Sequence, residues 1–194
     1  MKKGRIEAFS DGVIAIIITI MVLELKVPHK HSSLADLKPL LPVFLSYVLS
    51  FIYVGIYWNN HHHMFAVVSK VNGAILWANM HLLFWLSMIP FATSWMGENH
   101  FASAPVAIYG FVLLMNGVAY TILTLLLIRH HGDESTLSRA VGNDFKGKIS
   151  VVCYAIAIPC AFFQVWISGS LFVLVALLWL IPDLRIEKIL HEEG

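Results

Sequence analysis

Long apolar stretches alternate with short polar segments along this chain, a pattern typical of helices that cross a membrane. A bilayer core about 30 Å thick needs about 20 apolar residues per helix. The pattern predicts spans at residues 6–27, 40–58, 73–95, 105–128, 149–167 and 170–186. We therefore expect an all-α integral membrane protein with six transmembrane helices in a single domain, residues 1–194.

Prolines and small polar residues mark several of these boundaries. Pro28 follows the first span, and Pro39 and Pro42 lie in the first turn of the second, where proline is tolerated. Pro90 predicts a kink in the third span. The last apolar block is long for one span and short for two, so Ser168–Ser170 are interpreted as the break of a tight helical hairpin. A five-span arrangement is the alternative.

The lysines and arginines are unevenly distributed between the two sides of the predicted bundle. Six spans place both termini on one side, and cytoplasmic loops carry an excess of these residues. That side holds Lys2, Lys3, Arg5, Lys70, Arg129, Arg139, Lys146, Lys148, Arg185 and Lys188, against Lys26, Lys30 and Lys38 on the other. The distribution predicts a multi-pass protein of the cell membrane with both termini in the cytoplasm.

Composition narrows the range of functions. The chain is 58% hydrophobic and 13% charged, whereas soluble domains are roughly 45–50% apolar and about 25% charged. The longest polar segment, residues 129–148, leaves no room for a soluble catalytic domain, and the net charge of +1 does not point to nucleic acid. We expect neither an enzyme nor a cofactor. Cys153 and Cys160 share one apolar run and are interpreted as small buried hydrophobic residues.

Charged residues stand at the entrance of the first span. Asp11 lies about one and a half turns beyond Arg5. Because an acidic side chain is too short to reach far toward water, Asp11 requires a partner. The candidates are Arg5, a helix N-terminus, or a polar group on a neighbouring helix.

The same helix carries an apolar stripe. At 100° per residue, Ile16, Ile20 and Leu23 fall within about 60° of one another, together with Val27. Thr19 lies at one edge of this stripe and Glu24 on its other flank, whereas Asp11 points roughly the opposite way. The helix is apolar all round, so periodicity alone does not distinguish a pore-lining face from a lipid-facing or buried one.

The segment Arg5-x-x-x-Phe9-Ser10-Asp11 resembles the R-x-x-x-F-S-D signature of the transmembrane protein 175 family of potassium channels, and it opens the first span as in that family. Animal members carry two six-helix repeats, whereas single-repeat members are prokaryotic and assemble as tetramers. The resemblance therefore implies a prokaryotic homotetramer, embedded in membrane lipid, that passively conducts K⁺.

The resemblance also implies roles for particular residues. The first helix of each subunit would line a central pore, with the constriction at Ile16, Ile20 and Leu23. Thr19 occupies the position linked to potassium preference. The signature residues Arg5, Phe9, Ser10 and Asp11 would hold helices together. Glu24, near the outer mouth, is interpreted either as a cation-attracting group or as a solvated interfacial glutamate.

Ten histidines are many for 194 residues. His61–His63 and His130–His131 are expected on the cytoplasmic side, where they could cap helix ends, respond to pH or bind a metal. The spacing lacks the boxes of a membrane di-iron enzyme, so no metal site is predicted.

His81 is expected in a packing network that consists of Trp58, Asn59, Asn79, His81, Ser10 and Asp11. A secondary transporter and a histidine-rich metalloenzyme are the alternative functions.

Overall fold

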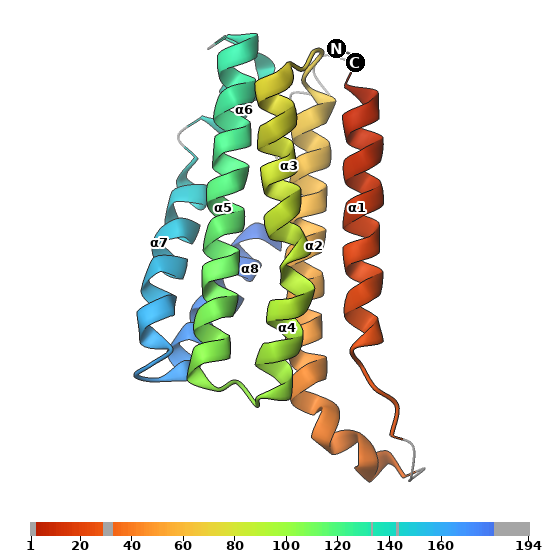
Figure 1. Cartoon of the computed structure of the whole chain (residues 1–194). Helices are drawn as coiled ribbons and strands as arrows, with labels where there is room; N and C mark the ends of the chain where they lie inside the picture. Colours follow the sequence, from red (N-terminus) through yellow and green to blue (C-terminus); the bar gives the residue numbers. More distant parts are fainter. Residues whose placement is uncertain (1–2, 29–32, 133, 143, 181–194) are drawn as a thin grey trace.

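The computed structural model describes residues 3–28, 33–132, 134–142 and 144–180, and this part of the chain is helical with no strand. Figure 1 shows the helices running largely along one axis. In chain order they are α1 (Gly4–Leu23), the 3-10 helix η1 (Leu34–Leu40), α2 (Leu41–Ala66), α3 (Gly73–Ser87), α4 (Ile89–Glu98), α5 (Ser103–His131), α6 (Thr136–Val141), α7 (Phe145–Cys160) and α8 (Val165–Leu180).

Four helical segments in the described part of the chain are long and apolar enough to cross a bilayer. They are Gly4–Leu23, Leu34–Ala66, Gly73–Glu98 and Ser103–His131. The predicted fifth and sixth spans correspond to α7 and α8. The helix α7 has 16 residues and so rises only about 24 Å, and α8 is described over Val165–Leu180. The predicted end of the sixth span, residues 181–186, lies outside the described residues, as do Arg185 and Lys188.

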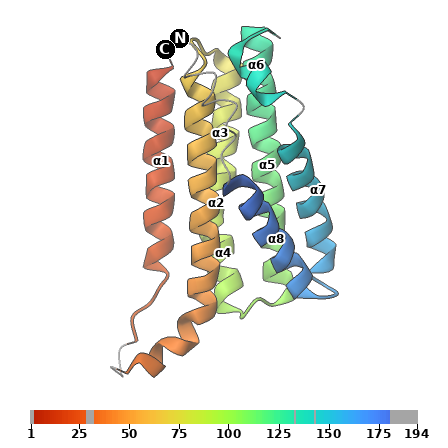
Figure 2. The ribbon, with the colours of Figure 1, turned by 180° about the vertical axis from the view of Figure 1, so that it is seen from behind.

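The helix α1 lies at one edge of the bundle. It packs against α2, α3 and α4, whereas α7 packs against α5 and α8 at the opposite edge (Figure 1). Seen from behind, α8 crosses obliquely over α2 and α5 (Figure 2). Among the described residues, one face of α1 is therefore left without a packing partner.

The third predicted span is broken at the position of its proline. The helix α3 ends at Ser87 and α4 begins at Ile89, because Pro90 has no N–H to continue the helix toward the Leu86 carbonyl. On the neighbouring α5, the buried Asn116 donates from Nδ2 to the Trp85 carbonyl at 3.2 Å. The predicted kink is thus confirmed as a one-residue interruption at Met88, next to a hydrogen bond from another helix.

The turn between α7 and α8 lies earlier than predicted. Both helices are continuous up to Cys160 and from Val165 onward, so Ser168–Ser170 lie inside α8 and their prediction as a break is wrong. The buried Ser168 donates from Oγ to the Ala157 carbonyl at 2.7 Å. A serine satisfied across the helix pair is tolerated within a helix. Cys153 and Cys160 on α7 are free and half-buried.

The basic and histidine-rich segments meet at one end of the bundle. The helix α2 continues past Trp58 through His61–His63 to Ala66, and Lys3 donates from Nζ to the carbonyls of Phe65 and Ala66 at its end. The α2–α3 loop contacts the end of α5 through hydrogen bonds to His131. The N-terminal end of α1 therefore lies on the same side as the α2–α3 loop and the end of α5.

Candidate ion pathway along α1

Two faces of α1 differ sharply in burial. Its inner stripe packs against the rest of the subunit and consists of Ile6, Ser10, Ile14, Ile17 and Met21. These residues recur every three or four positions, which is the helical period. On the outer side Ile16 is 57% exposed, Ile20 44% and Leu23 75%. The three residues predicted for the constriction are therefore exposed in the single subunit.

Thr19 lies on the same exposed side of α1. Its hydroxyl donates from Oγ1 to the Ile16 carbonyl at 2.9 Å, one turn earlier. Because the proton is used within the helix, the oxygen lone pairs are available to a group outside it. An oxygen acceptor in this position is the chemistry that a partly dehydrated cation requires.

A groove of about 600 Å³ runs beside the stripe, between α1 and the broken third span. Ile16, Ile20 and Glu24 line it from α1 or its end, and Phe91 and Ser94 line it from α4. Glu24 accepts through Oε2 from the Ser94 hydroxyl at 3.1 Å. Two predicted constriction residues and the predicted mouth residue thus border one groove.

The signature serine is the centre of a buried chain of hydrogen bonds. Ser10 is fully buried, and its Oγ accepts from Asn79 Nδ2 on α3 at 3.0 Å. The Asn79 Oδ1 accepts from His61 Nε2 on α2 at 2.8 Å, and the His61 ring stacks on Phe65 with centroids 4.5 Å apart. One asparagine therefore joins α1, α2 and α3.

Asp11 has a separate partner. Trp58 of α2 donates from Nε1 to Asp11 Oδ1 at 3.0 Å, in an exposed position. Of the partners considered for Asp11, the structure provides the polar group on a neighbouring helix. Arg5 and Phe9 are exposed, and no ion pair joins Arg5 to Asp11 among the described residues.

His81 does not belong to this chain of hydrogen bonds. Its Nε2 accepts from Trp85 Nε1 at 2.9 Å, one turn along its own helix. The predicted network is therefore corrected at this position, where His61 takes the role expected of His81. The sequence did hold a signal for His61, because it follows Trp58 by three residues on the same helical face.

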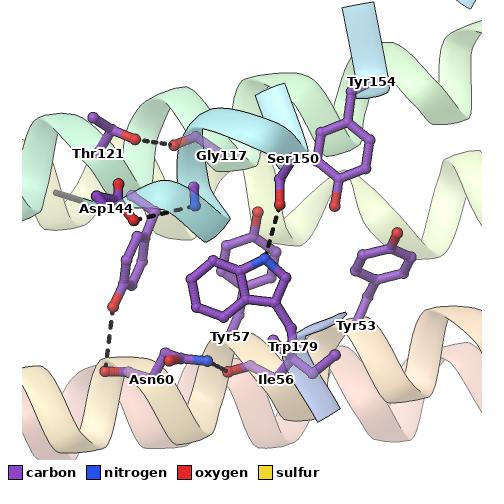
Figure 3. Close-up of a pocket in the computed structure, with 12 residues that line it drawn as sticks. Tyr53, Ile56, Tyr57, Asn60, Gly117, Thr121, Asp144, Ser150, Tyr154 and Trp179 are labelled. Carbon is purple, nitrogen blue, oxygen red and sulfur yellow. Dashed lines mark hydrogen bonds between the residues drawn. The ribbon is translucent and has the colours of Figure 1, made fainter. Parts of the chain in front are cut away.

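A small cavity lies elsewhere in the subunit and was not predicted. It holds about 40 Å³, enough for a few water molecules. Tyr53 and Tyr57 of α2 border it, together with Tyr154 of α7 (Figure 3). Trp179 of α8 closes one side and donates from Nε1 to Ser150 Oγ at 2.8 Å (Figure 3). None of its lining residues belongs to α1, so this cavity is separate from the candidate pathway.

The described residues contain no group of three or more His, Cys, Asp or Glu side chains placed to hold a metal ion. The histidines instead form hydrogen bonds and ring contacts, as His61 and His131 illustrate. The arrangement offers no observation in favour of a metalloenzyme.

Comparisons with known proteins agree with this geometry. The family described as "Endosomal/lysosomal potassium channel TMEM175" matches residues 5–90. A potassium channel of Chryseobacterium sp. (strain P1-3) is 61% identical over 192 residues, which cover 99% of this chain and 100% of that protein. A potassium channel of Chamaesiphon minutus is 32% identical over 193 residues, which cover 89% of this chain and 91% of that protein.

A solved structure shares the fold. The crystal structure of a lysosomal potassium-selective channel TMEM175 homolog from Chamaesiphon minutus matches with a TM-score of 0.82 and 28% identity, covering 93% of this chain and 97% of that one. These relatives and the structural neighbour are channels, and the chain is a membrane protein of the channel class rather than an enzyme. The chain belongs to the TMEM175 family of potassium channels.

Proposed function

We propose that this chain is one subunit of a homotetrameric, potassium-preferring passive cation channel of the cell membrane, with both termini in the cytoplasm. The relatives named above are described as potassium channels, which supports conduction over the alternatives of a transporter or a metalloenzyme. No covalent chemistry is required of any side chain.

The observation that carries the proposal is the exposed stripe of α1. Ile16, Ile20 and Leu23 face outward from a helix whose other side is packed into the subunit. A single subunit offers one such helix, which cannot enclose a pathway. Four copies around an axis would turn the stripes toward one another, and rings of apolar side chains close a pore by excluding water.

Thr19 is the proposed selectivity residue. Its hydroxyl donates to the Ile16 carbonyl and so offers its oxygen to a permeating ion. Four such oxygens in a ring would partly replace the hydration shell of K⁺. This shell is held less tightly than the hydration shell of Na⁺. The proposed role of Thr19 is therefore to lower the dehydration barrier for K⁺.

The remaining residues support α1. Glu24 is held by Ser94 beside the outer end of the stripe, where four carboxylates would attract cations toward the mouth. Ser10 and Asp11 bind α3 and α2 respectively. We assign Ser10 and Asp11 of the signature to helix packing and α1 itself to conduction.

The test is ion efflux from liposomes that contain the purified protein, with K⁺ and Na⁺ loaded separately. Passive efflux that is faster for K⁺ than for Na⁺ is the expected result. Efflux that needs an opposing gradient of a second ion would indicate a transporter. An intact oligomer that passes neither ion under any applied voltage would contradict the proposal.

A further inference from the structure

The histidine pair at the end of α5 has no role in the proposed pathway, yet its hydrogen bonds are unusually specific. Both residues belong to the last turn of α5, the end of which is drawn uppermost in Figure 1, and both contact the α2–α3 loop. The two imidazoles are adjacent, with centroids 5.2 Å apart and planes at 89°. Each of them contacts the loop through a ring nitrogen.

The partners of His131 fix its protonation state. Its Nδ1 lies 2.9 Å from the Leu127 carbonyl oxygen, which can only accept, so Nδ1 carries the proton. Its Nε2 lies 3.3 Å from the backbone N of Ser69 and 3.4 Å from that of Lys70, which can only donate. Nε2 is therefore the acceptor, and the ring is neutral.

The partner of His130 likewise requires a ring nitrogen that accepts a hydrogen bond. Asn72 accepts through Oδ1 from the backbone N–H of Ile75 at 2.9 Å, and so caps the start of α3. This orients the amide so that Nδ2, the donor, faces His130 Nδ1 at 3.3 Å. Nδ1 of His130 must be unprotonated to accept this bond.

We infer that His130 and His131 form an acid-released clamp that ties the α2–α3 loop and the start of α3 to α5. Both rings act as acceptors toward groups that can only donate. Protonation of either ring replaces an acceptor by a second donor, and its hydrogen bonds to the loop are lost. The clamp is therefore closed while both rings are neutral, and it opens when acid protonates either of them.

Other charged groups lie in this region. They are Lys70 on the loop, Arg129 beside the pair on α5 and Glu134 just beyond α5. Lys3 and Glu7 form an ion pair at 3.7 Å near the adjacent end of α2.

Release of the clamp affects the candidate pathway because the helices that follow the loop contact α1. Asn72 caps α3, α3 leads into α4, and Ser94 of α4 holds Glu24 beside the stripe of α1. The clamp therefore anchors one end of the helix pair against which α1 packs.

Hydrogen–deuterium exchange of the full-length protein at pH 7.5 and 5.5 tests the clamp independently of ion conduction. The quantity compared is the protection of the backbone amides of Ser69 and Lys70, corrected for the intrinsic effect of pH on exchange. In the wild type we expect protection to fall about tenfold at pH 5.5, as for the loss of one or two hydrogen bonds. The buried segment 112–119 of α5 should keep its protection.

A substitution separates this effect from general acid sensitivity. In the double variant His130→Gln/His131→Gln each amide has a donor and an acceptor but does not titrate, so protection should be the same at both pH values, whether high or low. His100→Gln, at an exposed position between α4 and α5, should behave as the wild type. Unchanged protection in the wild type, an equal acid-induced loss in the double variant, or a loss that extends to segment 112–119 would each overturn the inference.

Discussion

Asn79 of α3 donates its side-chain N–H to the hydroxyl oxygen of Ser10 on α1 at 3.0 Å, within a fully enclosed contact between the two helices. The same amide accepts from His61 through its oxygen. All three side chains are almost completely buried, so none of them can exchange its partner for water. This one buried amide of α3 therefore forms hydrogen bonds to both α1 and α2.

Replacing this amide should destabilise the subunit. Asn79→Ala leaves the Ser10 and His61 groups buried without partners, at a cost of about 1–3 kcal/mol, and should lower the melting temperature in detergent. Asn99→Ala is the control, because Asn99 is exposed and bonds only within its own helix end. Equal melting temperatures for the two variants would show that the buried chain does not stabilise α1.

The exposed face of α1 offers a matched pair for testing the constriction. Ile20 and Val22 are each 44% exposed but point in directions about 200° apart. Ile20→Asn should wet the constriction and raise K⁺ efflux about tenfold, which corresponds to a barrier lower by about 1.4 kcal/mol. Val22→Asn should conduct as the wild type. Efflux measured in liposomes would contradict the assignment if Val22→Asn had the larger effect.

The role of the Thr19 hydroxyl in selectivity can be tested separately from the role of the side chain's branched shape. Thr19→Val keeps the branched side chain but removes the oxygen, so most of the preference for K⁺ over Na⁺ should be lost. Thr19→Ser keeps the oxygen and should retain that preference. The measurement is the ratio of K⁺ to Na⁺ efflux rates, and a selective Thr19→Val channel would remove Thr19 from the selectivity role.

Asp11 should affect assembly more than ion preference. Asp11→Ala removes the acceptor for Trp58 Nε1, so the fraction of intact oligomer on size-exclusion chromatography should fall. Asp11→Asn keeps an acceptor oxygen and should assemble better. A stable Asp11→Ala oligomer that had lost its preference for K⁺ would instead place Asp11 in the conduction pathway.

Gly97 marks the closest approach of α4 to α2. A Cβ atom at this position would lie 2.7 Å from the Val43 Cα and 2.5 Å from the Ser46 Oγ. Gly97→Ala should therefore cost about 1–3 kcal/mol. Gly169→Ala in α8, where nothing lies within 4 Å, should instead add about 0.5–1 kcal/mol of stability. Thermal unfolding of the two variants should shift in opposite directions, and a shared direction would contradict the close contact.

The sequence predicted an all-helical membrane protein and a kink at Pro90, but not every partner. Asn79 and His81 are two residues apart on α3, and their side chains point about 200° apart. Both are polar and intramembrane, so the sequence placed both near Ser10. Only packing sets the rotation of α3 about its axis. That rotation turns Asn79 toward α1 and leaves His81 to bond with Trp85.

The α7–α8 turn was misplaced for a related reason. Serine and glycine are typical of turns, and Ser168–Ser170 is the strongest such signal in the block. The actual turn follows Pro159, and the Ser168 hydroxyl is satisfied by the Ala157 carbonyl. A long-range hydrogen bond of this kind leaves no trace in local sequence.

The unequal helix lengths give the subunit a thick side and a thin side. The 20 residues of α1 at one edge extend about 30 Å, whereas the 16 residues of α7 at the opposite edge extend about 24 Å along their axis. Lipid beside α7 must therefore become thinner, or this helix must stand more upright, at a cost of fractions of a kcal/mol per Å of mismatch. Acyl-chain length is thus a physical variable to which one edge of this protein responds and the other does not.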